Sequence, residues 1–345
     1  MKQMIYVAGA AVCGLLVATA TANAEAKLPD NLRIVIGSKS TGGDTYQNSA
    51  IVADALAQKL GINAKVDAVG SSAGFNILSR TSDGSVIMIF HDQAYLGHLY
   101  GKKGYENPFE AYKIGPTIAI NPGNAFLAPK SSPYNSIAEM IDAACQDKRI
   151  RVAIQPGGVS EIGYSALKNA VKLKCPGKEG NMAPVNTGSQ ADKNQLLFDG
   201  QADLINGSVQ ANEQFTRLPA DDQKAMKFLW LTARKATLEQ ANPEGMGGTT
   251  REQLVAFAAP NAIVQQDETK HFVFDKEFFF LYNKDMDPAI VADINKALTE
   301  IFAEGKIQET QKKSFFIPDF KPSAEAEAYL KDKAAQIEKV LKSIN

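Results

Sequence analysis

The sequence has few of the residues that most often carry out chemistry. Its 345 residues include 3 cysteines and 3 histidines, which leaves little material for a metal site with three or four ligands. An excess of charge of one sign is also missing, because 37 lysines and arginines nearly cancel 38 acidic residues. Without a basic excess, nucleic acids and anionic membrane surfaces are poor partners.

Long apolar runs are missing after the N-terminal segment. At the start of the chain, Lys2 precedes an apolar run from Met4 to Ala18 and the small-residue pattern Ala22-Asn23-Ala24. This order is typical of a secretory signal peptide, and the run is short for a membrane span. We therefore expect residues 1–24 to be removed by cleavage near Ala24, and the mature protein to be soluble and periplasmic.

Removal of this segment would leave two cysteines, Cys145 and Cys175. Both fall near the ends of predicted helices that flank a strand at 151–154. The expected compartment is oxidising, which allows a disulfide. The sequence leaves two alternatives open: a disulfide between the two cysteines, or two free and partly buried thiols.

A strand, a polar loop and a helix start follow one another at 33–60. The apolar helix positions Val52, Leu56 and Leu60 recur at four-residue spacing. The first turn of a helix has unpaired N–H groups and the positive end of the helix dipole, and both attract anions. The loop has hydroxyl groups but few acids or bases, which favours binding over catalysis. The candidate ligand-binding residues are Ser40, Thr41, Gly42, Gly43, Asp44 and Thr45, with Asp44 expected as the helix cap.

A second unit of this kind lies at 151–173, where a strand, a glycine-rich loop and a helix repeat the order. Ligands of open α/β sheets sit beyond the carboxyl ends of strands, so two lobes could aim two helix starts at one ligand and close by a hinge. The candidates in this loop are Gln155, Gly157, Gly158, Val159 and Ser160, with Ser160 also a candidate cap. Further candidates in other loops are Ser71, Ser72, Ala73, Gly188, Ser189 and Asn206.

Strands and helices alternate along the whole chain, which predicts an α/β fold with mostly parallel sheets in two lobes. The expected strands are 33–36, 65–69, 85–90, 112–120, 126–128, 151–154, 183–186, 202–205, 227–231 and 278–282. The expected helices are 44–60, 75–80, 92–100, 136–147, 161–173, 189–198, 287–304 and 323–343. Pro116 inside the fourth strand favours an edge position or a bend.

The stretch 70–74 matches the G-x-S-x-G pattern of serine hydrolases, between a predicted strand and a predicted helix. A secreted hydrolase with Ser72 as nucleophile is therefore an alternative. Its partner histidine would have to be His91, His98 or His271, and His271 lies beside a predicted strand rather than on a loop. The pattern is also short enough to occur by chance.

The sequence patterns that would indicate a metal site or a nucleotide site are incomplete. His91 and His98 are seven residues apart on one predicted helical face, but no third ligand is evident. The loop 37–43 is similar to a phosphate loop but lacks the Lys-Ser/Thr pair after its last glycine. We therefore expect no metal and no cofactor, and the histidines to be structural.

The segment 188–204, GSQADKNQLLFDGQADL, resembles a motif of a known family: the extracytoplasmic solute-binding proteins of tripartite tricarboxylate transporters. The Gly-Gly loop at 42–43, the Ser/Gly loop at 155–160 and the helix after Asp287-Pro288 occupy the places of that family's corresponding features. The resemblance extends over nearly the whole mature chain. Departures lie in the first loop, where Tyr46 stands at the usual acid position, and at Gly163, where the family commonly has a histidine.

The resemblance implies a periplasmic binding protein of type II-like fold with two hinged lobes. It implies lobe 1 at 25–127 and 251–345 and lobe 2 at 128–250. The ligand would be a small organic acid, such as a di- or tricarboxylate or an aromatic acid, held largely by backbone N–H groups and hydroxyls. The protein would be a monomer and not an enzyme, and would deliver its ligand to one large and one small integral membrane subunit. A solute receptor for another transporter class or for a sensor is an alternative.

Overall fold

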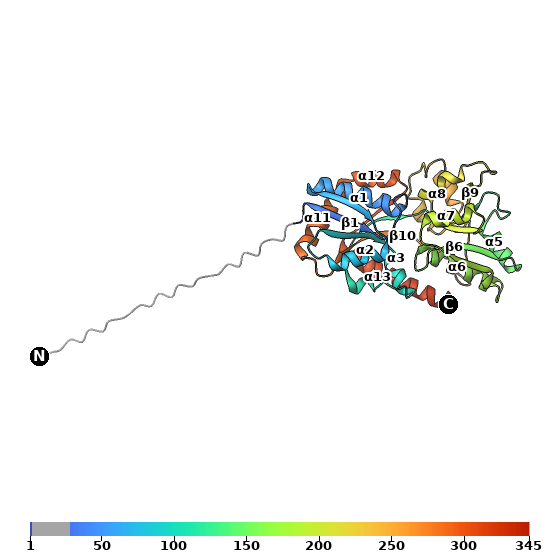
Figure 1. Cartoon of the computed structure of the whole chain (residues 1–345), viewed down its shortest axis with the longest axis horizontal. Helices are drawn as coiled ribbons and strands as arrows, with labels where there is room; N and C mark the ends of the chain where they lie inside the picture. The colour runs from blue at the N-terminus through green and yellow to red at the C-terminus, as the bar shows by residue number, and fades with distance from the viewer. Residues whose placement is uncertain (2–27, 345) are drawn as a thin grey trace.

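The computed structural model describes residue 1 and residues 28–344. Apart from Met1, the expected signal peptide and its cleavage position near Ala24 lie outside the described residues. The described chain forms two lobes side by side, each built on one mixed β-sheet with helices on its faces (Figure 1). None of the helices described is both long enough and apolar enough to cross a membrane.

The sheet of the first lobe has six strands in the order β11-β4-β10-β3-β1-β2. The bounds are β1 (Asn31–Ile36), β2 (Asn63–Ala68), β3 (Val86–His91), β4 (Tyr112–Asn121), β10 (Lys276–Asn283) and β11 (Ile317–Lys321). Strand β1 is parallel to β2 and β3, whereas β10 and β11 add antiparallel pairs. Every residue of β3 and β10 is buried, because helices cover both faces of the sheet.

Alternation along β10 divides the core of this lobe in two. Phe278 and Phe280 pack on one face with α1 and α11, whereas Phe279 and Leu281 pack on the other with α2. The helices of this lobe are α1 (Asp44–Leu60), α2 (Ser71–Arg80), α3 (Gln93–Leu99), α4 (Pro108–Ala111), α11 (Pro288–Glu304), α12 (Lys306–Lys313) and α13 (Ser323–Ile344). Helix α11 shows how sequence sets the bounds. Asp287 accepts a bond from the Ala289 amide at the start, and Gly305 takes a left-handed conformation at the end.

The sheet of the second lobe has five strands in the order β7-β6-β8-β5-β9. The strands are β5 (Asn124–Pro129), β6 (Ile150–Ile154), β7 (Met182–Asn186), β8 (Leu204–Ser208) and β9 (Met226–Leu231). The helices are α5 (Ile137–Cys145), α6 (Val159–Lys174), α7 (Gln190–Phe198), α8 (Val209–Thr216), α9 (Lys235–Leu238) and α10 (Arg251–Val255), with a 3₁₀ turn at Glu179–Asn181. Strand β6 is parallel to both β7 and β8, and β5 pairs antiparallel with β8 and β9.

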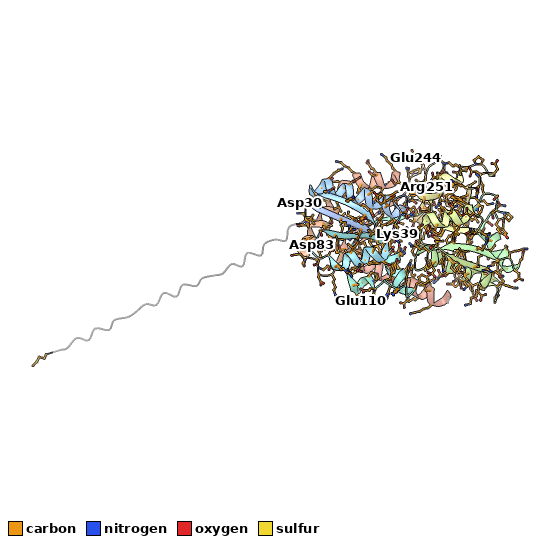
Figure 2. The ribbon with its side chains drawn as sticks, in the orientation of Figure 1. Asp30, Lys39, Asp83, Glu110, Glu244 and Arg251 are labelled. Atoms are coloured by element: carbon orange, nitrogen blue, oxygen red, sulfur yellow. A yellow bond between two sulfur atoms is a disulfide. The ribbon has the colours of Figure 1, made fainter. Side chains whose placement is uncertain are left out.

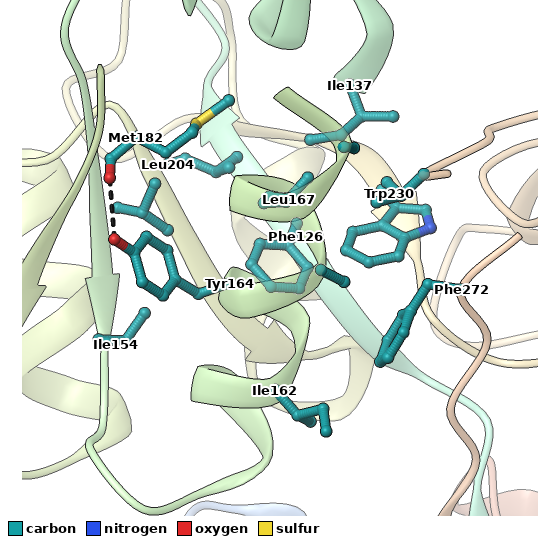
Figure 3. Close-up of a cluster of buried hydrophobic side chains, with 14 of the residues drawn as sticks. Phe126, Ile137, Ile154, Ile162, Tyr164, Leu167, Met182, Leu204, Trp230 and Phe272 are labelled. Carbon is teal, nitrogen blue, oxygen red and sulfur yellow. Dashed lines mark hydrogen bonds between the residues drawn. The ribbon is translucent and has the colours of Figure 1, made fainter. Parts of the chain in front are cut away.

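An aromatic stack fills the core of the second lobe (Figure 3). The ring centroids of Phe126 and Trp230 are 5.0 Å apart, and Phe272 meets Trp230 edge-on. Gly163 on α6 makes this stack possible, because a Cβ at that position would lie 2.6 Å from the Phe126 ring. The Tyr164 hydroxyl beside it donates to the backbone carbonyl of Met182 at 2.8 Å.

The chain passes between the two sheets at Pro122-Gly123 and returns just before Lys276. Helix α13 packs against both lobes, with Leu330 in the core of the first and Ile337 in the core of the second. We propose lobe boundaries at these two crossings rather than at 127 and 250, because all of β5 belongs to the second sheet. The segment that contains Phe272 also packs in the second lobe.

Pro116 was expected either on an edge strand or at a bend, and the structure supports the second. Pro116 does not lie on an edge strand, because β4 lies between β11 and β10. The pairing with β10 shifts register between Thr117 and Ile114, so the proline lies at an irregularity of the strand. A bend of this kind tolerates a residue that has no N–H to donate.

Several elements differ from the sequence prediction. Helices α4, α8, α9, α10 and α12 and strand β11 were not predicted, and α2 begins at Ser71 rather than at 75. Residues 206–208 belong to β8 instead of a loop. His91 ends β3 rather than starting a helix, so it shares no helical face with His98.

A disulfide joins Cys145 at the end of α5 to Cys175 just after α6, with 5.7 Å between the Cα atoms. The closed loop spans 30 residues. Replacing both cysteines by serine should therefore lower the free energy of unfolding by up to about 3–4 kcal/mol, through greater freedom of the unfolded chain. Urea unfolding with and without a reductant tests this. Reductant should lower the midpoint of the wild type and leave that of the double variant unchanged.

Candidate functional site

A cavity of about 420 Å³ lies between the two lobes. Both sheets contribute to it, mainly through loops that follow β1, β2, β3, β6 and β7, and Lys39 marks its position between the lobes in Figure 2. Its polar lining comprises Ser38, Lys39, Ser40, Asp44, Thr45, Ser71, Ser72, His91, Gln93, Lys102, Tyr105, Asn124, Gln155, Ser160, Ser189, Gln190, Lys193, Asn206, Ser208 and Lys276.

Four helices begin at this cavity: α1 and α2 from the first lobe, α6 and α7 from the second. Three of them have glycine at the cap position, namely Gly43, Gly70 and Gly158, and no side chain caps them. The N–H groups of their first turns therefore remain available to a ligand, except for the Thr45 amide, which bonds to Asp44, and the Glu161 amide, which bonds to the Gly158 carbonyl. Helix α7 differs, because the Ser189 hydroxyl accepts a bond from the Asp192 amide.

Most of the residues expected from the sequence line the cavity. They are Ser40, Gly43, Asp44, Thr45, Ser71, Ser72, Ala73, Gln155, Val159, Ser160, Gly188, Ser189 and Asn206. Thr41 and Gly42 do not, because they are exposed at the outside of their loop. Gly157 and Gly158 are buried behind the loop surface, where the Lys102 side chain covers Gly157.

Asp44 is not the cap of α1, since Gly43 holds that position. Its carboxylate accepts a bond from the Thr45 amide at 2.8 Å and forms an ion pair with Lys276 at 2.7 Å. The Asn121 side chain donates a further bond. Burial acts to raise the pKa of Asp44, but Lys276 and these hydrogen bonds outweigh burial and hold it below its usual value.

Ser160 is likewise not a cap. It is the second residue of α6, and its hydroxyl accepts a bond from the Gln155 amide at 2.7 Å. The Glu161 carboxylate accepts one from the Gly157 amide. These two bonds hold the loop 155–158 against its own helix, so the loop presents a fixed wall to the cavity.

The main feature that the sequence analysis missed is a set of four lysines in the lining: Lys39, Lys102, Lys193 and Lys276. Asp44 is the one acidic residue among the described residues of the lining. A sequence signal existed for two of them. Lys193 stands four residues before Leu197 on the buried side of α7, and Lys276 opens a strand that is otherwise apolar or aromatic over most of its length.

These lysines differ in which groups offset their positive charge. Lys276 pairs with Asp44, and the Lys102 ammonium donates to the backbone carbonyl of Pro156 at 2.6 Å. Lys193 is 5% exposed, and its ammonium makes no hydrogen bond or ion pair within the described part of the chain. Burial, followed by repulsion from Lys276, lowers the pKa of Lys193 to about 7, although Asp44 offsets part of the effect.

His91 lines the cavity and is neutral. Burial lowers its pKa well below the usual value, and the charges of Lys276 and Lys333 lower it further. Its Nδ1 accepts a bond from the Gln93 amide at 3.2 Å, so its proton is carried by Nε2. The imidazole ring packs between Phe90 and Phe278.

The structure also shows where the residues of the alternative functions lie. In the described chain, Ser72 has no hydrogen bond to a histidine, and of the three histidines His91 is the one that lines the cavity. The Ser71 hydroxyl donates to the Gly37 carbonyl at 2.9 Å. No group of three or more His, Cys, Asp or Glu side chains suited to a metal occurs among the residues described.

Comparisons with known proteins agree with this architecture. No protein-family model and no curated protein matches the sequence. The solved periplasmic binding protein BugD is similar over 91% of this chain and 97% of its own, with a TM-score of 0.67 and 17% identity. MatC from Rhodopseudomonas palustris, solved with malate, covers 91% of this chain and 99% of its own, with a TM-score of 0.66 and 14% identity.

A third solved structure, Rpa4515 from R. palustris with adipate, covers 92% of this chain and 98% of its own, with a TM-score of 0.69 and 16% identity. At such low identities these likenesses show the fold. They confirm the predicted two-lobed α/β architecture of periplasmic binding proteins.

The buried pair between Asp44 and Lys276 gives a stability prediction. Asp44→Asn should cost roughly 3–5 kcal/mol of unfolding free energy, because it leaves Lys276 buried without a counter-charge. The pKa of Asp44 is depressed in the folded state, so this contribution is present above about pH 4 and disappears as the pH falls through the folded value. Urea unfolding at pH 7 and in a series of lower pH values measures it.

Two variants serve as controls. Asp54→Asn changes an exposed carboxylate on the same helix and should shift stability by less than about 0.5 kcal/mol. The double change Asp44→Asn with Lys276→Met removes both charges and should recover most of the loss. Equal stability of Asp44→Asn and wild type at pH 7 would contradict the importance of the pair.

Proposed function

We propose that the chain is the periplasmic solute-binding protein of a tripartite tricarboxylate-type transporter, and that it captures a small organic carboxylate between its lobes. The observation that carries this proposal is the lining of the cavity. The lining contains uncapped helix starts and four lysines. Its one aspartate among the described residues is already paired with Lys276. Such a lining stabilises an anion through helix dipoles, free amides and ammonium groups.

A carboxylate would accept bonds from first-turn amides of α1, α2 and α6, with hydroxyls of Ser40 and Ser72 as further donors. The neutral imidazole of His91 would add an N–H donor. The volume of about 420 Å³ suits a molecule of metabolite size. Malate in MatC and adipate in Rpa4515 are ligands of this kind in proteins of the same fold.

Capture would close the lobes around the ligand, because the ligand contacts both lobes only in the closed form. The closed protein, acting as a monomer, would then deliver the acid to one large and one small membrane subunit. A receptor for another transporter class or for a sensor would use the same cavity. Uptake of the acid by vesicles that hold both membrane subunits, with and without this protein, separates these alternatives.

Binding, not catalysis, is the proposed role of the stretch 70–74. It starts a helix at the cavity, as an anion site does, and a hydrolase would require a base beside Ser72. Purified protein should therefore show no ester hydrolysis, and Ser72→Ala should leave this background unchanged. Turnover that is lost in Ser72→Ala would establish the hydrolase alternative instead.

Ligand class can be tested by a thermal-shift screen of mono-, di- and tricarboxylates and aromatic acids, with amines and neutral sugars as controls. An acid present at about 100 times its Kd stabilises the folded state by about 2.7 kcal/mol, which raises Tm by several degrees. We expect at least one carboxylate to do so. A shift with amines or sugars, and none with any acid, would rule the proposal out.

A further inference from the structure

Lys193 is the one buried lysine of the cavity whose ammonium forms neither an ion pair nor a hydrogen bond within the described chain. An ammonium group in such a place is costly, because burial removes most of its contact with water and the protein supplies no partner. Helix α7 carries it in its first turn, from the second lobe. The uncapped starts of α1 and α2 face the cavity from the first lobe.

Most of the other charged side chains of the cavity are also positive. The titratable groups that line the same cavity are Lys39, Asp44, His91, Lys102, Tyr105 and Lys276. Asp44 is already paired with Lys276, and His91 is neutral. No carboxylate in the described lining forms an ion pair with Lys193, so its ammonium is open to a negative group on a ligand.

Building on the proposed function, we propose that Lys193 binds a second acidic group of the ligand and thereby makes the cavity selective for small dianions over monoanions. One carboxylate would bind the amides at the helix starts of the first lobe. The other would form the missing ion pair with Lys193 in the second lobe. A monoacid can satisfy one of these sites and leaves the other without a partner.

This arrangement requires Lys193 to take up protons when a diacid binds. Near pH 7 the empty protein holds Lys193 partly neutral. A carboxylate beside it raises its pKa, so binding a diacid takes up a fraction of a proton from the buffer. Affinity for a diacid should therefore fall as the pH rises above about 7, whereas affinity for a monoacid that occupies only the helix starts should not.

Isothermal titration calorimetry with matched acids tests the proposal. The probes are succinate against butyrate and adipate against hexanoate, each pair differing by one carboxylate. In Lys193→Met, affinity for the diacid that binds best should fall roughly 30-fold or more, with little change for its monoacid partner. Lys39→Met removes an exposed lysine of the same cavity and should weaken both members of a pair alike, by a few-fold.

Two further measurements keep the test independent of whether one variant folds. Lys193→Met should melt at the same or a higher temperature than the wild type without ligand, because it removes an uncompensated buried charge. The wild type should show proton uptake with the diacid when titrated in buffers of different ionisation enthalpy. Lys193→Gln should bind it without proton uptake.

The outcomes distinguish this inference from the proposed function. If diacids bind the wild type with no proton uptake, and Lys193→Met keeps the same preference for them, Lys193 does not select the ligand, although the protein still binds carboxylates. If no acid of either kind binds the wild type, the proposed function itself fails.

Discussion

The ion pair between Asp44 and Lys276 is the interaction around which the cavity is built. It joins the first turn of α1 to the start of β10, 232 residues further along the chain, and Asn121 ties it to the end of β4. A carboxylate at the start of a helix would repel an anionic ligand. Lys276 cancels that charge, so the site keeps its positive potential while α1 stays anchored to the centre of the first sheet.

The remaining charges decide what the cavity can do. Apart from the paired Asp44, its polar groups are amides, hydroxyls, a neutral imidazole and ammonium groups, and a set of hydrogen-bond donors of this kind favours an anion. Ser72 at the start of α2 has no hydrogen bond to a histidine in the described chain. Lys193 and Lys276 are both buried lysines of the cavity, but only Lys276 has an ion-pair partner among the described residues, and the role proposed for Lys193 rests on this difference.

The order of strands and helices and the positions of the two main loops could be predicted from sequence, because apolar periodicity and glycine-rich turns are local signals. Helix α12, with its mostly polar sequence, and strand β11, with Pro318, had weak local signals and form through contacts with distant strands. The pairing of Asp44 with Lys276 could not be predicted either, since it depends on tertiary structure. Lys193 could have been noticed as a lysine at an apolar position of its helix.

Gly163 limits the substitutions that positions 163 and 126 can accept. Its lack of a side chain lets Phe126 lie against α6 and stack on Trp230. Any larger residue at 163 would need the space that the Phe126 ring fills, and a smaller residue at 126 would leave a void beside the glycine. Packing therefore couples the residue sizes that these two positions can hold. A relative with a bulky residue at the first should carry a small one at the second.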